Sequence, residues 1–330
     1  MGRGRSSLAR VLYRLSIKSD RSREWKNCSS FSSIRYHHTS EILWMEGTCH
    51  TDTMDSFRSF PDDSTASLDS ALHSGKDGVR KEVGTAMIAI EEMSLHAWPA
   101  LQTSIHKGCI FRVSDGYSRR ANSANPLYMR QEDALAVIDH AETLYAQHNL
   151  PPIFKILGGP SYAPLDALLV QRRYEKVTPT LVMTLDRISA IEPNPICVDY
   201  QDRFTEAWFN VFADINMISG TRKDTAWRIC SSIENPVVVA SVRRHGEIVA
   251  CGYGAIENGY VGLFDIVVRE SMRRKGLGKA LVEGLLLQAN RFGAERAYLQ
   301  VVDSNVGAKK LYSSIGFTPS YTYWYRQKFL

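Results

Sequence analysis

Hydrophobic and polar residues follow two different regimes along the 330-residue chain. In residues 1–86, serine-rich and short polar runs dominate, and no helical or alternating period persists beyond residues 8–17. From Leu95 onward, short apolar-polar runs alternate with longer stretches of helical period. The pattern predicts a low-order or disordered extension over residues 1–86, because it offers little apolar surface to bury, followed by folded α/β structure.

In the first folded half, turn-forming residues separate predicted strands and helices. Asp115-Gly116 suits a tight turn, so we expect it to join strands at 108–114 and 117–122 in a hairpin. Helical period over 131–148 is closed by Pro151-Pro152. The pattern then predicts a strand, a helix and a strand at 153–157, 165–173 and 180–185. Two prolines make residues 188–195 the predicted linker.

The second half repeats this theme with clearer boundaries. Two helices, at 204–213 and 225–233, precede three strands at 237–242, 247–256 and 260–268, which turn at His245-Gly246 and Asn258-Gly259. A helix starting near Gly276, a strand at 297–302, a helix at 306–315 and a strand at 321–325 complete the chain. The predicted fold class is α/β (α+β), with a mixed, largely antiparallel central sheet flanked by helices.

Composition and charge narrow the classes of partner. The chain is 44% hydrophobic and 23% charged, with a formal charge of +5 and much of the basic excess before residue 40. We therefore expect no nucleic-acid partner. Six cysteines without a CxxC pair predict neither a metal site nor disulfides, and no apolar run is long enough to cross a membrane. A cytoplasmic protein fits best, although the acid-free, arginine-rich residues 3–18 are also typical of a transit peptide. The alternative is an unstructured extension, with Met87 or Met93 as the working start.

One cationic loop is the strongest candidate binding site. Arg273, Arg274 and Lys275 precede two glycines and an apolar helix. A helix start exposes unpaired N–H groups and the positive end of the dipole, and glycine lets an anion approach the main chain. The segment therefore predicts a pyrophosphate site, with a charged turn before a core helix as the alternative. Leu281 and Ala280 exclude the GxGxxG and GxxxxGK[ST] loops.

Two motifs resemble those of the GCN5-related N-acetyltransferase family. Arg273-Arg-Lys-Gly276-Leu-Gly278 is similar to the family's acetyl-CoA loop, [Q/R]-x-x-G-x-[G/A]. Residues 305–317 are similar to its N-x-x-A-x-x-L-Y-x-x-x-G-F element. The resemblance covers about residues 198–330, with one departure at Glu270, where many members have proline.

The resemblance implies transfer of an acetyl group from acetyl-CoA to a primary amine of a small molecule, by direct attack and without a metal. Backbone N–H groups of residues 274–279 would hold the pyrophosphate, and the strand main chain would pair with the pantetheine arm. Asn305 would bind the arm or, alternatively, cap the helix that follows it. The implied cofactor contacts are Ile266, Val267, Val268, Arg273, Arg274, Lys275, Gly276, Leu277, Gly278, Lys279 and Asn305.

The same resemblance supplies catalytic candidates. Tyr312 occupies the family's general-acid position, whereas a tyrosine at helical spacing is more often a core residue. Asp265 is a candidate base because an acid within an apolar strand needs a reason, and Glu257 is the alternative. Asp265 could also be a structural acid. Strand alternation places Asp265 on the face opposite Ile266.

The first half could be a degenerate copy of the second. When Leu168 is set against Leu311, Tyr174 meets Phe317, and Leu169 stands where Tyr312 does. This alignment predicts a degenerate domain over 87–187, the linker at 188–195 and an acetyltransferase domain over 196–330; a chance match of a helix–strand unit is the alternative. The rival function is a catalytically weak acyl-CoA-binding sensor, and we expect a monomer or homodimer.

Overall fold

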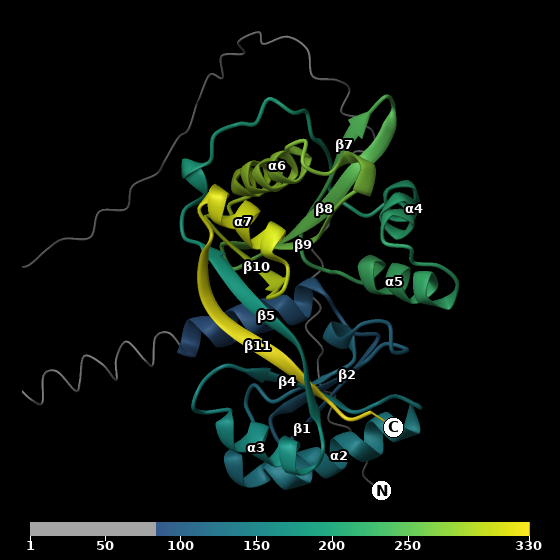
Figure 1. Ribbon diagram of the computed structural model, residues 1–330, viewed down its shortest axis with the longest axis vertical. Coiled ribbons are helices and arrows are strands. Elements are labelled where there is room, and N and C mark those ends of the chain that lie inside the picture. Colours follow the sequence, from purple (N-terminus) through teal and green to yellow (C-terminus); the bar gives the residue numbers. More distant parts are fainter. Residues whose placement is uncertain (1–83, 330) are drawn as a thin grey trace, which may run out of the picture. The chain divides into compact units, whose positions relative to one another are not determined.

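An eleven-stranded sheet organises residues 84–329, the part of the chain that this computed structural model describes (Figure 1). The strand order is β1-β2-β3-β4-β11-β5-β10-β9-β8-β7-β6. Of the predicted low-order extension, residues 1–83 lie outside the described residues, and residues 84–86 belong to a helix over residues 84–97. The strands are β1 (Gln102–His106), β2 (Cys109–Val113), β3 (Ala124–Asn125), β4 (Ile153–Leu157), β5 (Glu175–Leu185), β6 (Asp199–Gln201), β7 (Val237–Arg244), β8 (Glu247–Glu257), β9 (Tyr260–Val268), β10 (Arg296–Val302) and β11 (Thr318–Gln327).

Helices α2 (Ala134–Gln147) and α3 (Ala163–Gln171) come from the first half of the chain (Figure 1). The second half contributes α4 (Glu206–Ile215), α5 (Thr221–Ser231), α6 (Leu277–Arg291) and α7 (Val306–Ile315). Short 3-10 helices are η1 (Arg119–Ala121), η2 (Gln131–Asp133), η3 (Ile188–Ala190) and η4 (Glu270–Met272). Within residues 84–329, no helix combines the length and the hydropathy that a membrane span requires.

The predicted fold class is confirmed. Every neighbouring pair of strands is antiparallel except β3 with β4 and β9 with β10, which are parallel. Helices α6 and α7 pack over one hydrophobic cluster, which contains Leu263 and Leu281. The helix over residues 84–97 packs with α4 and α5 over another cluster, which contains Tyr253 and Phe264. These clusters are called the α6 face and the α4 face below.

The two halves of the chain share strands in the middle of the sheet. Strand β11, at the end of the chain, lies between β4 and β5 and is antiparallel to both (Figure 1). Strand β5 in turn lies between β11 and β10. Each half therefore places its last strand beside strands of the other half, and residues 188–195, the predicted linker, connect parts of one continuous sheet.

The order of elements is the same in both halves. The series β1-β2-β3-α2-β4-α3-β5 has the same sequence of strands and helices as β7-β8-β9-α6-β10-α7-β11. The ends of α3 and α7 also match. Tyr174 N–H donates to the Leu169 carbonyl at 2.9 Å, and Phe317 N–H donates to the Tyr312 carbonyl at 3.1 Å. These are the residue pairs of the proposed alignment, and the tandem copy stays a prediction.

Most elements predicted from the sequence pattern are present in the structure, but one predicted hairpin is not. The predicted strand at 260–268 and helix at 306–315 are confirmed by β9 and α7. The hairpin at Asp115-Gly116 is wrong: β1 and β2 turn at Lys107-Gly108, which have φ 48° and 73°. A Cβ at Gly108 would lie 2.2 Å from the Tyr128 carbonyl oxygen, so only glycine fits this turn.

The segment after β2 forms a compact loop for a specific reason. The Asn122 side-chain oxygen accepts hydrogen bonds from the N–H groups of Ser114 (2.7 Å) and Gly116 (3.0 Å). These bonds fold residues 114–122 back on themselves, with η1 in place of the predicted strand at 117–122. The sequence pattern also gave no prediction of β6 or of the helix over residues 84–97, although Met87, Ile90 and Met93 have helical spacing.

Candidate active site

The exposed backbone edge of β9 is the first component of the site. Its parallel register with β10 ends at the pair Leu263–Leu299, although β9 continues to Val268. On the other side, Val267 is paired with Cys251, and Arg269 N–H donates to the Val249 carbonyl at 2.8 Å. Peptide groups alternate between the two sides of a strand. The backbone of Val267 therefore faces β8, whereas the backbones of Ile266 and Val268 face the β10 side.

The loop before α6 supplies hydrogen-bond donors and positive charge. Arg274 and Gly276 have φ 60° and 76°, so the backbone turns sharply into the helix. Ala280 is the first residue of α6 whose N–H donates a hydrogen bond within the first turn of the helix; the acceptor is the Gly276 carbonyl, at 3.0 Å. The N–H groups of residues 277–279 precede it and have no acceptor within the helix. Arg274 and Lys275 are exposed beside them.

Gly278 joins the loop to two other elements. A Cβ at this position would lie 3.3 Å from Leu311 Cδ1 of α7 and 3.6 Å from Val268 Cγ2 of β9. The end of β9, the start of α6 and the middle of α7 therefore meet at one point. Both predicted motifs contribute to this meeting point, and the glycine serves packing as well as access to the main chain.

Tyr312 lies next to Leu311 on α7 and is partly buried on the α6 face. Its ring meets Phe317 edge to face, with 6.0 Å between the ring centroids. Burial raises the pKa of the Tyr312 phenol to about 12. The side chain therefore packs as a core aromatic and also keeps its proton at neutral pH, as a general acid requires.

Asp265 lies at an irregularity in β9. Its φ is 52°, and the register with β8 shifts between Cys251 and Tyr253, so the strand bulges there. One carboxylate oxygen, Oδ1, lies 3.8 Å from a guanidinium nitrogen of Arg120. The other, Oδ2, is buried without a hydrogen-bond partner among the described residues. Burial raises the pKa of Asp265, and the positive charge of Arg120 opposes that rise.

Asp265 and Tyr312 occupy opposite faces of the sheet. Ile266 and Val268 pack on the α6 face with Tyr312. Phe264 packs on the α4 face, and the Arg120 guanidinium that approaches Asp265 lies 5.5 Å from the Phe264 ring centroid. A group lying along the edge of β9 would therefore have the carboxylate on one side and the phenol on the other.

Arg120 is a residue that sequence reasoning missed. It comes from η1 in the first half, and its guanidinium also lies 5.0 Å from the centroid of the Trp98 ring. Its side chain is 29% exposed and that of Asp265 15%. No local motif surrounds Arg120, and the sequence carries no signal that a residue so far upstream reaches β9.

The alternative base, Glu257, is placed differently. It ends β8, opposite Tyr260 at the start of β9, and so lies at the far end of that strand from Val268. Its carboxylate is 3.0 Å from His96 Nδ1 and 3.0 Å from Asn235 Nδ2. Within residues 84–329, no group of three His, Cys, Asp or Glu is arranged to hold a metal ion.

Asn305 caps α7. Its side-chain oxygen accepts a hydrogen bond from the Ala308 N–H at 3.1 Å. The capping role weighed for this residue is therefore present. This hydrogen bond uses only the side-chain oxygen, and an asparagine amide also has an NH2 group that can donate, so capping is compatible with a contact to a ligand.

Comparisons with known proteins identify the family of this chain. A family model described as "Probable histone acetyltransferase Rv0428c C-terminal" matches residues 85–326. The chain is 31% identical over 244 residues to "Uncharacterized N-acetyltransferase YobR" of Bacillus subtilis (strain 168), which covers 72% of this chain and 97% of that protein. It is 42% identical over 55 residues to the ribosomal protein bS18-alanine N-acetyltransferase of Escherichia coli (strain K12), covering 17% of this chain and 37% of that protein.

A solved structure shares the fold. A GCN5-related N-acetyltransferase from Kribbella flavida superposes with a TM-score of 0.57 at 15% identity, covering 73% of this chain and 95% of that chain. The family-model match spans both halves of the chain and includes every residue of the site described above.

Proposed function

We propose that this chain, which belongs to the GCN5-related N-acetyltransferase family and is an N-acetyltransferase, moves an acetyl group from acetyl-CoA to a primary amine of a small molecule. The observation that carries the proposal is the meeting of three elements around Gly278: the edge of β9, the cationic start of α6, and α7 with Tyr312. Each supplies what a different part of acetyl-CoA needs.

The residues present fit the cofactor's two polar regions. The N–H groups of residues 277–279 and the exposed side chains of Arg274 and Lys275 suit a pyrophosphate, because they combine donors, a helix dipole and formal charge. The outward backbones of Ile266 and Val268 suit the amide-bearing pantetheine arm, which could pair with β9 as an added strand. Acetyl-CoA would supply the acetyl group and a thiolate leaving group.

Asp265 and Tyr312 divide the proton chemistry. Asp265 accepts the proton that the attacking amine loses, directly or through water, as the new carbon–nitrogen bond forms. Tyr312 donates its phenolic proton to the departing sulfur as the carbon–sulfur bond breaks. Their positions on opposite faces of the sheet support this division, since base and acid then act on opposite sides of the reacting carbonyl.

The enclosure of Asp265 favours a small acceptor. Its side chain is 15% exposed, and a guanidinium nitrogen of Arg120 lies 3.8 Å from its Oδ1. A small amine could reach the carboxylate more easily than a folded protein surface could. The relative from Escherichia coli named for ribosomal protein bS18 favours a second candidate, an extended peptide with a free N-terminus.

The test is a measurement of CoA thiol release by the purified full-length chain. Acetyl-CoA would be offered with a panel of polyamines, aminoglycosides, amino acids and short peptides, and the acetylated product identified by mass. We expect turnover with a small amine and weak or no turnover with peptides. Binding of acetyl-CoA without release of thiol from any amine would instead identify an acyl-CoA-binding sensor.

A further inference from the structure

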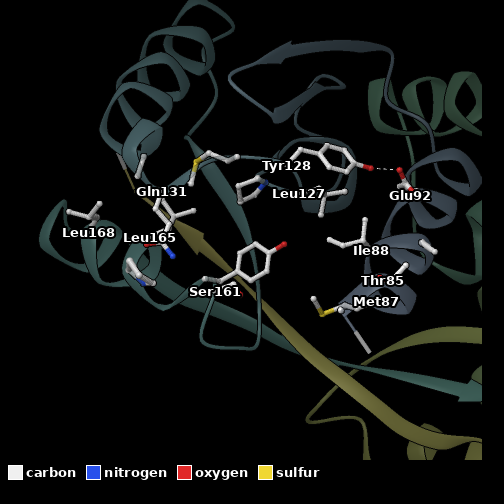
Figure 2. Close-up of a pocket in the computed structure, with 17 residues that line it drawn as sticks. Thr85, Met87, Ile88, Glu92, Leu127, Tyr128, Gln131, Ser161, Leu165 and Leu168 are labelled. Carbon is white, nitrogen blue, oxygen red and sulfur yellow. Dashed lines mark hydrogen bonds between the residues drawn. The ribbon is translucent and has the colours of Figure 1, made fainter. Parts of the chain in front are cut away.

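A cavity lies in the first half of the chain, and no residue of β9 or α6 lines it. It has a volume of about 550 Å³ and opens between the helix over residues 84–97, the segment that follows β3, and α3 (Figure 2). Ile88, Leu127 and Leu165, one from each of these elements, line it (Figure 2). The volume lies within the range of about 300–1,000 Å³ that is usual for small-molecule pockets.

The cavity occupies the place in the first half that the candidate active site occupies in the second. In the second half, the site uses the segment after β9, the first residues of α6, and α7. The cavity uses the segment after β3, the first residue of α2 (Ala134), and α3. These elements correspond in chain order, and the matching hydrogen bonds at the ends of α3 and α7 fix their register. The cavity therefore lies among elements that correspond in chain order to those of the candidate active site.

The charge of this cavity is opposite to that of the candidate active site. Where the second half has Arg273, Arg274 and Lys275 before α6, the first half has Arg130, Gln131, Glu132 and Asp133 before α2. Arg130 pairs with Glu132 at 2.5 Å. Asp133 pairs with Lys107 at 2.5 Å. This loop therefore offers no positive charge that is left over for a phosphate.

Glu92 is the charged residue among those that line the cavity. The Tyr128 hydroxyl donates a hydrogen bond to Glu92 Oε1, which fixes the carboxylate at the opening (Figure 2). The second oxygen, Oε2, remains able to accept another donor. Apolar side chains, including those of Met129 and Leu168, line the interior. The lining thus combines an apolar chamber with one anionic group at its mouth.

We propose that this cavity is a second ligand site, for a small apolar molecule that carries a protonated amine. The apolar part would enter the chamber, and the ammonium group would donate to Glu92. The proposal concerns binding in the first half and does not require acetyl transfer in the second, so the two can fail independently.

Calorimetric titration of the full-length chain with two probes of the same shape tests the charge preference. The probes are 1-naphthylmethylamine, which is cationic, and 1-naphthylacetate, which is anionic. We expect the amine to bind at least tenfold more tightly than the acid. Glu92→Gln should weaken amine binding about tenfold, because a charge-assisted hydrogen bond is lost. Glu132→Gln, which removes a charge outside the cavity, should change it less than twofold. Equal affinity for both probes, or an unchanged Glu92→Gln variant, would overturn the proposal.

Two further measurements locate the probe. Leu168→Trp fills the cavity and should abolish amine binding, whereas Val170→Trp, at an exposed position of the same helix, should not. Thermal melting shows whether each variant is folded. Saturating CoA should leave amine binding unchanged. If CoA or the substitution Asp265→Asn abolishes binding instead, the amine occupies the acceptor position of the active site, and the second site does not exist.

Discussion

Two ionisable side chains at the candidate active site have pKa values displaced in ways that suit complementary tasks. Burial raises the pKa of Tyr312 to about 12, so the phenol stays protonated across the physiological range. Burial also raises the pKa of Asp265, while Arg120 limits that rise by favouring the ionised form. In the proposed mechanism, the first shift would keep Tyr312 as a proton donor, and the second would bring Asp265 closer to the basicity needed to accept a proton from the attacking amine.

Replacing Tyr312 by phenylalanine removes the proton and keeps the ring. Because the ring still packs against Phe317, we expect a normal melting temperature and an unchanged Kd for acetyl-CoA. Loss of general-acid catalysis should lower kcat by about 10²-fold or more. Steady-state kinetics with an acceptor that turns over measures the effect. A variant with wild-type kcat would leave Tyr312 as a core aromatic and remove it from the mechanism.

Arg120 should act on the reaction through Asp265. Arg120→Met removes the charge that lowers the pKa of Asp265, so that pKa should rise further. The base must be ionised to work, so the acidic limb of the pH profile of kcat/KM should move to higher pH. Arg119→Met is the matched control, since Arg119 donates to Gln327 at 2.9 Å instead. If both variants keep the wild-type profile, Arg120 has only a packing role beside Trp98.

The raised pKa of Asp265 should also make the stability of the folded chain depend on pH. A carboxyl whose pKa is raised on folding contributes most to stability below its unfolded pKa, near 3.9, and that contribution is lost as pH rises through the folded value. We therefore expect Asp265 to contribute less to stability at neutral pH than at acidic pH.

At the scale of single residues, the sequence allowed prediction of those candidate site residues that belong to a local motif. Tyr312, Gly276 and Gly278 stand in recognisable patterns, and each lies on or at the start of the helix that the pattern predicted. Arg120 could not be found in this way, because its relation to Asp265 depends on folding that brings η1 beside β9. The bulge at Asp265 was equally hidden, since no glycine or proline marks it.

At the scale of elements, periodicity worked where one face of an element is buried and failed where side chains redirect the backbone. Helices α6 and α7 each bury a regular face, so their patterns were informative. Strand β9 has consecutive buried residues on both faces, and the Asn258-Gly259 turn before it was its signal instead. The Asp115-Gly116 prediction failed because the hydrogen bonds of Asn122 make a compact loop out of a plausible hairpin. The turn that exists, at Lys107-Gly108, has only its glycine as a signal.

The start of α6 gives a test at this scale. Gly278→Val should weaken acetyl-CoA binding at least tenfold, because a branched side chain beside the first N–H groups hinders the approach of a pyrophosphate. It should also lower the melting temperature, since its Cβ would lie 3.3 Å from Leu311. Adding Leu311→Ala makes room and should restore part of the stability without restoring the affinity. Calorimetry and thermal melting separate the two effects.

The double variant with Gly278→Val and Leu311→Ala can also contradict this prediction. If the double variant recovers both stability and acetyl-CoA affinity, the effect of the valine passes through α7 alone. Gly278 would then be a packing residue, and the N–H groups of residues 277–279 would lose their place in the cofactor proposal.

At the scale of the whole described region, the sequence could suggest two similar halves. It could not show that the last strand of each half pairs with strands of the other half. A boundary at residues 188–195 follows from prolines and polarity, which are local properties. The position of β11 between β4 and β5 depends on pairing between residues far apart in the chain, such as Thr322 with Leu181. Buried Ile188, whose N–H donates to the Glu295 carbonyl at 2.9 Å, also ties the start of this connection to the second half.

Expressing the halves separately tests this arrangement. Residues 1–192 would contain β4 and β5 without the β11 that joins them, and residues 193–330 would contain β10 and β11 without β5. Unpaired strand edges and exposed apolar faces should prevent either fragment from melting cooperatively alone. Co-expressed fragments should associate, because β5 and β11 pair across most of their length, and should recover a cooperative transition and acetyl-CoA binding. If residues 193–330 alone fold and bind acetyl-CoA, the second half is an autonomous domain. The shared strands would then be a later addition to a complete site, and Arg120 could not be needed for its assembly.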